Sequence, residues 1–267
     1  MQGNNQEFYD AYFNASDYEV FRYDVGSFCT RKIILQHLEH RNGNLLEIGT
    51  GISSMLEDLQ GFKCHGLDIS AKTIAQVENK FKEKNIKAYL HVANAEHLPF
   101  ADNHFDAIIS AHTFEHIEHD DQALRECMRI LKPGGELIIF VPGRIDGTAT
   151  QDEWKRLGHY RSYNKKRFDD LAKMVSPGMQ LTSLIYPHKI HNLLWNRLKN
   201  LFRWVNYPLK KWILCDNKTY EIRPTYQRIL LPCMVYLLDI FDRLTQKTEK
   251  NLWGIEFNVL VKFKKLM

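Results

Sequence analysis

The sequence predicts an α/β fold in which a mostly parallel, seven-stranded sheet carries helices on both faces and has an antiparallel last strand. Short apolar runs alternate with amphipathic stretches of helical length from about residue 44 to residue 174, which is typical of a parallel sheet covered on both faces. Two further apolar runs, 179–186 and 255–263, are suited to antiparallel strands at the edge of that sheet. With 267 residues, 44% of them hydrophobic, the chain is long enough to bury such a core.

Each element is expected from its own pattern. A first helix is expected near 28–40, because Ile33, Ile34 and Leu38 lie on one side and Asn42-Gly43 ends it. Short apolar runs bounded by turn residues predict parallel strands near 44–48, 62–67, 87–92, 104–110 and 136–141. Amphipathic stretches predict helices near 52–60, 71–84, 119–131 and 164–174.

One long segment interrupts this regular pattern. Residues 187–254 separate the last two predicted strands, which is far more than a turn needs. We therefore expect one domain, 1–267, with a helical lid at 1–40, a core at 41–186 and 255–267, and a helical cap inserted at 187–254. The part 190–212 combines apolar residues at helical spacing with tryptophans and basic residues. It is expected either to cap the substrate or to contact an anionic membrane surface.

A glycine turn follows the first predicted strand. Gly49 and Gly51 can take unusual backbone angles and let a ligand approach the main chain. Asp68 follows the second strand, at the distance where dinucleotide folds place the acid that binds ribose hydroxyls. The alternative is that Asp68 only caps the helix that begins near Ala71.

Further motifs follow in a fixed order, and together they resemble one family. They are Asn94-Ala95-Glu96-His97-Leu98-Pro99-Phe100, Phe105-Asp106-Ala107-Ile108-Ile109-Ser110, Glu115-His116-Ile117 and Leu131-Lys132-Pro133-Gly134-Gly135-Glu136-Leu137-Ile138-Ile139. With the glycine turn, they make residues 40–142 similar to the class I S-adenosylmethionine-dependent methyltransferases, in the branch of the ubiquinone and menaquinone biosynthesis enzymes.

The resemblance implies a Rossmann-like fold that binds S-adenosylmethionine and releases S-adenosylhomocysteine. Asp68 is expected to accept both ribose hydroxyls, Ile69 to lie against the adenine, and Asn94 to replace the family's usual Asp beside the adenine amino group. Glu47 is expected to orient the loop or to meet the donor's ammonium group. The full set of expected donor-binding residues is Glu47, Gly49, Thr50, Gly51, Asp68, Ile69, Asn94, Ala95, Ala111 and His112.

The acceptor is expected to be a small or lipid-linked molecule methylated on oxygen or carbon. Ser110-Ala111-His112-Thr113 stands where enzymes acting on planar nitrogen carry Asn or Asp, two prolines and an aromatic residue. Gly158-His159-Tyr160-Arg161-Ser162-Tyr163 resembles a Gly-His-x-Arg-x-Tyr pattern of this branch. The expected catalytic residues are His116, His159 and Tyr163, and the expected substrate-binding residues are Tyr12, Tyr18, Arg22 and Arg161.

Composition limits the alternatives. The formal net charge of +4 is too mild to argue for nucleic acid, although the basic insertion leaves an RNA methyltransferase or a non-catalytic binding module as rival functions. The five scattered cysteines have no zinc or redox spacing, and we expect reduced thiols. His112, His116 and His119 could be imagined as a metal site, but they straddle a loop and a helix start, and no metal is expected. The polar start and the lack of long apolar runs predict a cytoplasmic protein, or one peripheral on the inner membrane face, of unknown oligomeric state.

Overall fold

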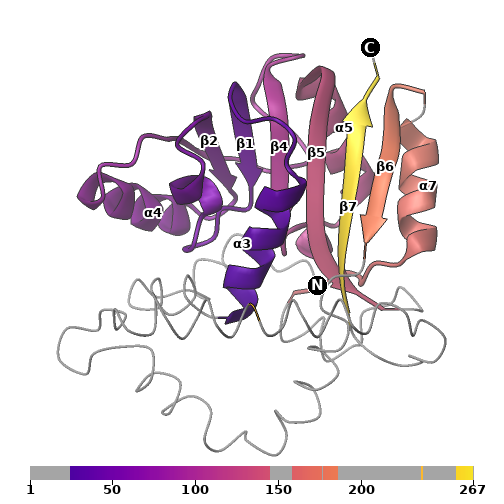
Figure 1. The fold of residues 1–267 in the computed structure, drawn as a ribbon, viewed down its shortest axis with the longest axis horizontal. Coiled ribbons are helices and arrows are strands. Elements are labelled where there is room, and N and C mark those ends of the chain that lie inside the picture. Colours follow the sequence, from indigo (N-terminus) through magenta and orange to yellow (C-terminus); the bar gives the residue numbers. More distant parts are fainter. Residues whose placement is uncertain (1–24, 145–157, 176, 186–235, 237–256, 267) are drawn as a thin grey trace, which may run out of the picture.

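The computed structural model describes residues 25–144, 158–175, 177–185, 236 and 257–266. Its centre is a seven-stranded sheet in the order β3-β2-β1-β4-β5-β7-β6 (Figure 1). The strands are β1 (Asn44–Ile48), β2 (Lys63–Asp68), β3 (Tyr89–Val92), β4 (Phe105–Ala111), β5 (Leu131–Gly143), β6 (Met179–Ile185) and β7 (Phe257–Lys265). Strands β1 to β5 pair in parallel, and β7 lies antiparallel between β5 and β6. The predicted fold class is confirmed.

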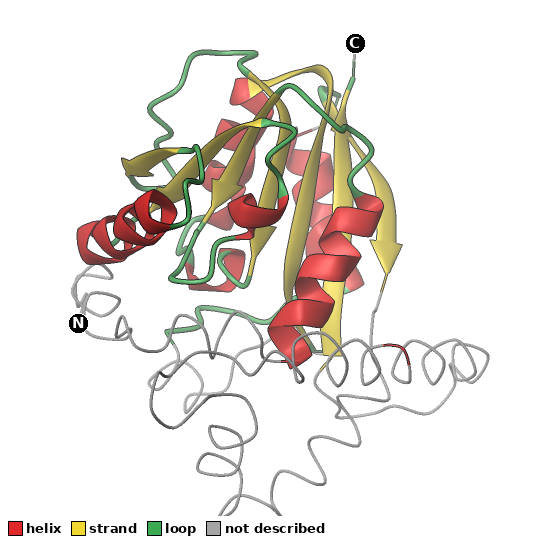
Figure 2. Ribbon diagram, turned by 60° about the vertical axis from the view of Figure 1, so that its left-hand side comes forward, coloured by secondary structure: helices red, strands yellow, loops and turns green. Residues whose placement is uncertain are grey.

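Helices cover both faces of the sheet because successive strand residues point to opposite sides (Figure 2). The helices are α3 (Val25–His37), α4 (Ala71–Glu83), α5 (Asp120–Ile130) and α7 (Lys165–Val175). On one face, Leu45 and Ile109 pack in a core with Ile34 of α3. On the other face, their neighbours Leu46 and Ile108 pack in a core that includes residues of α5 and α7.

Two predicted elements differ in the structure. The helix expected at 52–60 is only a 3-10 turn, η2 (Met55–Asp58). The buried Glu47 carboxylate accepts hydrogen bonds from Ser54 Oγ (2.5 Å) and Met55 N (3.0 Å), so the chain before η2 is tied to β1 and cannot wind into a helix. Strand β5 begins at Leu131 and not near residue 136, since Leu131 already pairs with Phe105 before a register shift.

The topology places a ligand site at the carboxyl ends of the central strands. The chain runs outward from β1 through β2 to β3 on one side, and the next strand, β4, lies on the other side of β1, so the strand order reverses at β1. In open α/β sheets, ligands bind in the crevice that opens at such a point. The backbone amides of Gly49 and Thr50 donate to Leu67 O (2.8 and 3.1 Å), which ties the glycine turn to the end of β2.

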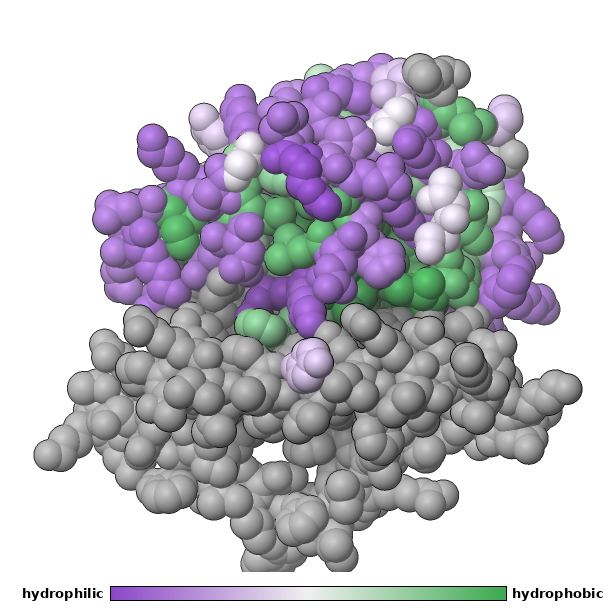
Figure 3. All heavy atoms as spheres, viewed as in Figure 1, coloured by the Kyte–Doolittle hydropathy of each residue, from purple (hydrophilic) through white to green (hydrophobic). Residues whose placement is uncertain are grey.

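The surface of the described residues is mostly hydrophilic in the view of Figure 3, with apolar side chains gathered over α3 and the strands beside it. None of the helices in the described ranges has the length and apolar character needed to cross a bilayer. The expected lid residues Tyr12, Tyr18 and Arg22 lie outside the described residues, as does the inserted segment 187–254 apart from residue 236.

Candidate active site

A cavity of about 650 Å³ opens where the carboxyl ends of β1, β2 and β4 meet. All ten residues expected to bind the donor line this cavity, together with His116 and His159. The lining also includes Thr30 and Arg31 of α3, as well as Glu115. The motifs that are separate in the sequence therefore converge on one space, because each follows a strand end on the same edge of the sheet.

The two glycines of the turn have left-handed backbones, with φ of +74° at Gly49 and +49° at Gly51. Gly49 is also close-packed: a Cβ there would lie 2.0 Å from Thr113 Oγ1. At Gly51 a Cβ would meet no atom within 4 Å, so this residue borders open space. Gly49 is needed for packing against the β4 loop, and Gly51 leaves room beside the main chain for a ligand.

Asp68 holds the glycine turn and faces the cavity. Its Oδ2 accepts from Gly51 N (3.0 Å) and its Oδ1 accepts from Ser70 N (3.0 Å). The cap of α4 is Ser70, whose hydroxyl accepts from Thr73 N (3.0 Å). The alternative that Asp68 is the helix cap is therefore wrong, and its half-buried carboxylate is placed between the turn and the cavity.

Glu47 and Asn94 also make local hydrogen bonds. The Glu47 carboxylate is 2% exposed and is bound by the Ser54 and Met55 donors described above, which corresponds to the loop-orienting role expected for it. Asn94 is exposed, and its Oδ1 accepts from Glu96 N (2.9 Å). An amide oxygen has two lone pairs, so this bond leaves Asn94 able to accept a second donor.

His112 follows β4 in an unusual conformation. Its φ is +51°, a left-handed value uncommon for a residue with a side chain. The backbone is held there by the hydrogen bond from His112 N to Phe140 O (2.8 Å). Strained backbone of this kind is concentrated at functional sites, and here it brings His112 Nδ1 to 3.5 Å from Glu115 Oε1.

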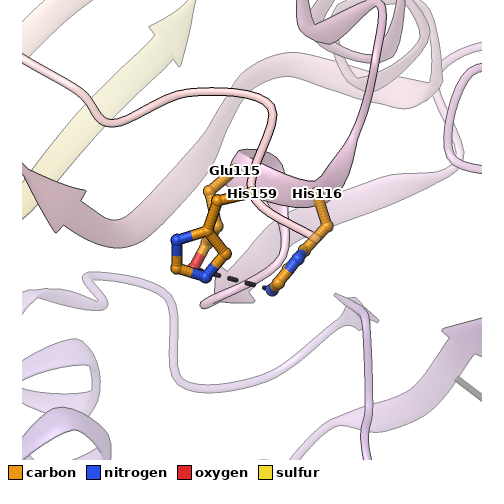
Figure 4. A group of neighbouring side chains, drawn as sticks. All are labelled: Glu115, His116 and His159. Carbon is orange, nitrogen blue, oxygen red and sulfur yellow. Dashed lines mark ion pairs between the residues drawn. The ribbon is translucent and has the colours of Figure 1, made fainter. Parts of the chain in front are cut away.

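Glu115, His116 and His159 form a group at the edge of the cavity (Figure 4). Glu115 and His116 lie on the 3-10 turn η3 (Phe114–His116), and His159 lies in the segment 158–164 that precedes α7. His116 Nε2 is 4.0 Å from Glu115 Oε1, and the two imidazole centroids are 4.7 Å apart. Burial raises the pKa of Glu115, but hydrogen bonding to His112 and the nearby His116 and His159 outweigh this, so its pKa is lowered.

Arg161 and Tyr163 do not line the cavity, unlike His159. Tyr163 is fully buried and its hydroxyl donates to Asp120 Oδ2 (2.9 Å). Burial, followed by the charge of Asp120, raises the pKa of Tyr163 well above its ordinary value, so it keeps its proton. Arg161 donates to Ile117 O and Glu118 O (2.5 Å each). Both side chains join loops in the structure, and neither reaches the cavity where the catalytic role expected for Tyr163 and the substrate-binding role expected for Arg161 would place it.

The comparisons with known proteins agree with this site. A family model described as "Methyltransferase domain" matches residues 46–139. Over 110 residues, the chain is 31% identical to the ubiquinone/menaquinone biosynthesis C-methyltransferase UbiE of Chromobacterium violaceum, a match that covers 41% of this chain and 42% of that protein. Residues 46–139 therefore match a methyltransferase domain, as the sequence motifs led us to expect. The family resemblance of the sequence motifs is confirmed.

The chain is also similar to a relative with a different named activity. Over 150 residues the chain is 28% identical to phosphoethanolamine N-methyltransferase 2 of Caenorhabditis elegans, covering 54% of this chain and 34% of that protein. The chain thus spans less than half the length of these two curated relatives.

Solved structures share the fold of the methyltransferase domain. Phosphoethanolamine N-methyltransferase 2 of Haemonchus contortus, in complex with S-adenosyl-L-methionine, has a TM-score of 0.69 at 17% identity, covering 99% of this chain and 60% of that chain. The [4+2]-cyclase SpnF has a TM-score of 0.61 at 16% identity, covering 89% and 80%. At these identities the likeness shows the fold, and a fold does not by itself fix a reaction.

Sequence reasoning missed two buried carboxylates of the methyltransferase domain. Glu115 belongs to the motif from which His116 was selected, but its own burial was not foreseen. Asp120 was counted only as part of a predicted helix, yet it is fully buried and paired with Arg167. No signal in the sequence marked either carboxylate, because their burial depends on contacts between segments that are distant in the chain.

Proposed function

We propose that this chain transfers the methyl group of S-adenosylmethionine to an oxygen or carbon of a small or lipid-linked acceptor and releases S-adenosylhomocysteine. The observation that supports it is the convergence of the glycine turn, Asp68 and Asn94 on one cavity at the carboxyl ends of β1, β2 and β4. The open space beside Gly51 and the cavity-facing carboxylate of Asp68 fit an adenosyl group with ribose hydroxyls.

The residues divide the work as follows. Asp68 binds the ribose hydroxyls, Asn94 meets the adenine amino group, and Ile69 and Ala95 supply apolar contacts. When bound, the donor supplies an electrophilic methyl group on a sulfonium. Transfer is an in-line displacement, so the main task of the chain is to align the acceptor and to exclude water.

His116 or His159 is the base in this proposal. Both line the cavity, and a base there takes the proton of an acceptor hydroxyl as the new bond to carbon forms. His116 Nδ1 lies 3.2 Å from Gly158 O, which selects the tautomer with its proton on Nδ1 and a lone pair on Nε2.

The named relatives support a second acceptor class. The Caenorhabditis elegans relative is named as an N-methyltransferase of phosphoethanolamine. Its amine nitrogen is not planar, so the argument from Ser110-Ala111-His112-Thr113 against planar nitrogen does not apply to it. A comparison of amine, phenol and quinol acceptors by methyl transfer from labelled donor separates the two classes.

The first test is a calorimetric titration of the full chain with S-adenosylhomocysteine, with NAD as the control ligand. Binding of the former alone is expected, because the motif series is that of methyl donors. Equal binding of NAD, or no binding of either, would overturn the proposed donor. Binding without methyl transfer to any acceptor class would instead favour a different use of the fold, as in SpnF, which is named as a [4+2]-cyclase.

Asp68→Asn is expected to weaken S-adenosylhomocysteine binding by at least about tenfold, since the ribose hydroxyls lose a charged acceptor. The matched control is Asp121→Asn, which alters an acid at the surface of α5 that pairs with Arg125 (2.8 Å). Unchanged affinity in Asp68→Asn, or an equal loss in the control, would contradict the assignment.

A further inference from the structure

We propose that Glu115, His116 and His159 form a binding site for a divalent transition-metal ion at the edge of the cavity. One ligand atom from each residue lies within 4.8 Å of those of the other two. Figure 4 shows the three side chains converging from two separate loops. The expectation of no metal, drawn from the sequence, considered His112, His116 and His119 and did not foresee the carboxylate.

The Glu115 carboxylate carries the inference. Its side chain is 1% exposed, and its Oε2 has no hydrogen-bond partner within the part of the chain that the structure describes. A buried carboxylate oxygen without a partner is costly unless a proton donor or a cation meets it. Because Glu115 also lines the cavity, an ion can reach it from there.

His116 is oriented as metal-binding histidines are. Its Nδ1 is 3.2 Å from the backbone oxygen of Gly158, which leaves Nε2 as the ligand atom, 4.0 Å from Glu115 Oε1. A backbone carbonyl on the second ring nitrogen is the usual way in which proteins fix the tautomer of a metal ligand. Ligand atoms around one ion lie roughly 3 to 3.5 Å apart, so side-chain rotations that bring these atoms about 1 to 2 Å closer complete the site.

The position of the third ligand is fixed by the loops. Tyr160 N donates to Glu115 O (2.8 Å), and Arg161 binds the carbonyls of Ile117 and Glu118. These bonds hold the segment carrying His159 against η3, so the two imidazoles stay at 4.7 Å between centroids. The buried Asp120, which accepts from Tyr163, anchors the same segment below the cavity.

The ligand set indicates the class of ion. Two imidazoles and one carboxylate suit Zn²⁺, Mn²⁺, Fe²⁺ or Co²⁺, whereas Mg²⁺ and Ca²⁺ favour sites built from oxygen alone. Three protein ligands leave coordination positions open toward the cavity. If the proposed methyl transfer is correct, those positions would bind an oxygen atom of the acceptor, and the ion would promote loss of its proton in place of a histidine base, because a metal-bound imidazole nitrogen cannot take a proton.

The test is a titration of the chelator-treated full chain with Zn²⁺ by calorimetry, with Co²⁺ absorption as a spectroscopic readout. The wild-type protein is expected to bind one Zn²⁺ more tightly than Mg²⁺. Glu115→Gln and His159→Gln are each expected to raise the dissociation constant for Zn²⁺ at least about tenfold. The matched control is His119→Gln, which changes an exposed histidine that makes no capping bond to α5.

Thermal unfolding of each variant shows whether it is folded. If Glu115→Gln does not fold, His159→Gln alone tests the site. Zn²⁺ binding that is absent, or equal in wild type and His159→Gln, would overturn the site, as would an equal loss in His119→Gln. The Zn²⁺ titration needs neither methyl donor nor acceptor. A protein that binds Zn²⁺ but not S-adenosylhomocysteine would keep this site and lose the proposed function.

Discussion

Gly49 and Gly51 have similar backbone angles but different surroundings, and this difference separates packing from ligand access at the level of single residues. A side chain at Gly49 would collide with Thr113, whereas one at Gly51 would enter the space that we assign to the donor. A left-handed backbone disfavours alanine at both positions by about 1 kcal/mol.

Gly49→Ala is therefore expected to lower the free energy of unfolding by roughly 2 to 4 kcal/mol, since overpacking adds to backbone strain. Gly51→Ala is expected to lower it by about 1 kcal/mol but to weaken S-adenosylhomocysteine binding as well. Urea unfolding and calorimetry on the two variants check this. Equal destabilisation by Gly49→Ala and Gly51→Ala would mean that Thr113 can move away from the new methyl group without a loss of stability.

The residues of the proposed donor site could be placed around one cavity from the sequence because they follow strand ends, and strand ends can be located from apolar runs. Asp68 and Asn94 each follow such a run, so the sequence alone places them at one edge of the sheet. Arg161 and Tyr163 also have side chains suited to binding or proton transfer, yet both side chains point into the protein, where they contact Asp120. That direction depends on a contact between distant segments, which spacing along the chain does not encode.

Among the elements, strands and amphipathic helices were predicted within a few residues, because their buried faces repeat at fixed periods. The 52–60 segment has apolar residues at helical spacing too, but the Glu47 carboxylate binds Ser54 and Met55 before a helix can begin. The start of β5 at Leu131 was missed for a different reason: Pro133 and the two glycines that follow it are typical of a turn, so the sequence predicted that the strand begins after them.

The loop after residue 157 is joined to η3 by Arg161, and this connection can be tested. Arg161→Met keeps the apolar stem and removes the donors to Ile117 O and Glu118 O. We expect a loss of about 1 to 3 kcal/mol in unfolding free energy, because partly buried carbonyls lose charged donors. Arg125→Met removes an exposed pair with Asp121 (2.8 Å) and is expected to change stability by less than about 0.5 kcal/mol. Similar losses in both variants would contradict the connection.

At the β2–β3 edge, the ring of His65 stacks on the rings of His91 and Tyr89. Burial, followed by the nearby His91, His104 and Lys63, lowers the pKa of His65 from 6.5 to about 4. Between these two pH values the unfolded chain binds a proton that the folded chain excludes. The contribution of neutral His65 to the free energy of unfolding is therefore fully present above pH 6.5 and is lost as the pH falls from 6.5 toward about 4.

The wild-type protein is expected to lose about 2 kcal/mol more than His65→Phe when the pH is lowered from about 7.5 to about 5. Urea unfolding of both proteins at the two pH values measures the difference. Phenylalanine keeps an aromatic ring in the stack and does not titrate. A loss of the same size in both proteins would assign the acid sensitivity to other groups.

For the whole molecule, a buried ion pair joins segments from distant parts of the chain. Lys262 Nζ on β7 is 2.6 Å from Glu136 Oε2 on β5, and it also reaches Glu39 (2.7 Å) beyond the end of α3. Burial raises the pKa of Glu136, but donation from His40 N, Lys262 and Glu39 N outweighs this and lowers it. The carboxylate therefore stays charged inside the protein.

Lys262→Met is expected to reduce the free energy of unfolding by about 3 to 5 kcal/mol, because it leaves that carboxylate without its cation. Lys264→Met, on the same strand but half-exposed and 3.5 Å from Glu39, is expected to cost less than about 1 kcal/mol. Chemical unfolding of the two variants makes the comparison. A small effect of Lys262→Met would mean that water reaches Glu136.

The position of β7 between β5 and β6 has a consequence for how the protein folds. Both neighbours precede it in the chain, and β7 pairs with both. On the ribosome, β5 and β6 are therefore complete well before the strand that must lie between them has been made. Until Phe257–Lys265 emerges, the two strands have facing unpaired edges, which are open to contact with other chains. We expect the yield of native protein to depend on protection of this gap during synthesis, and chaperone supply to matter more for this step than for the donor-binding half of the sheet.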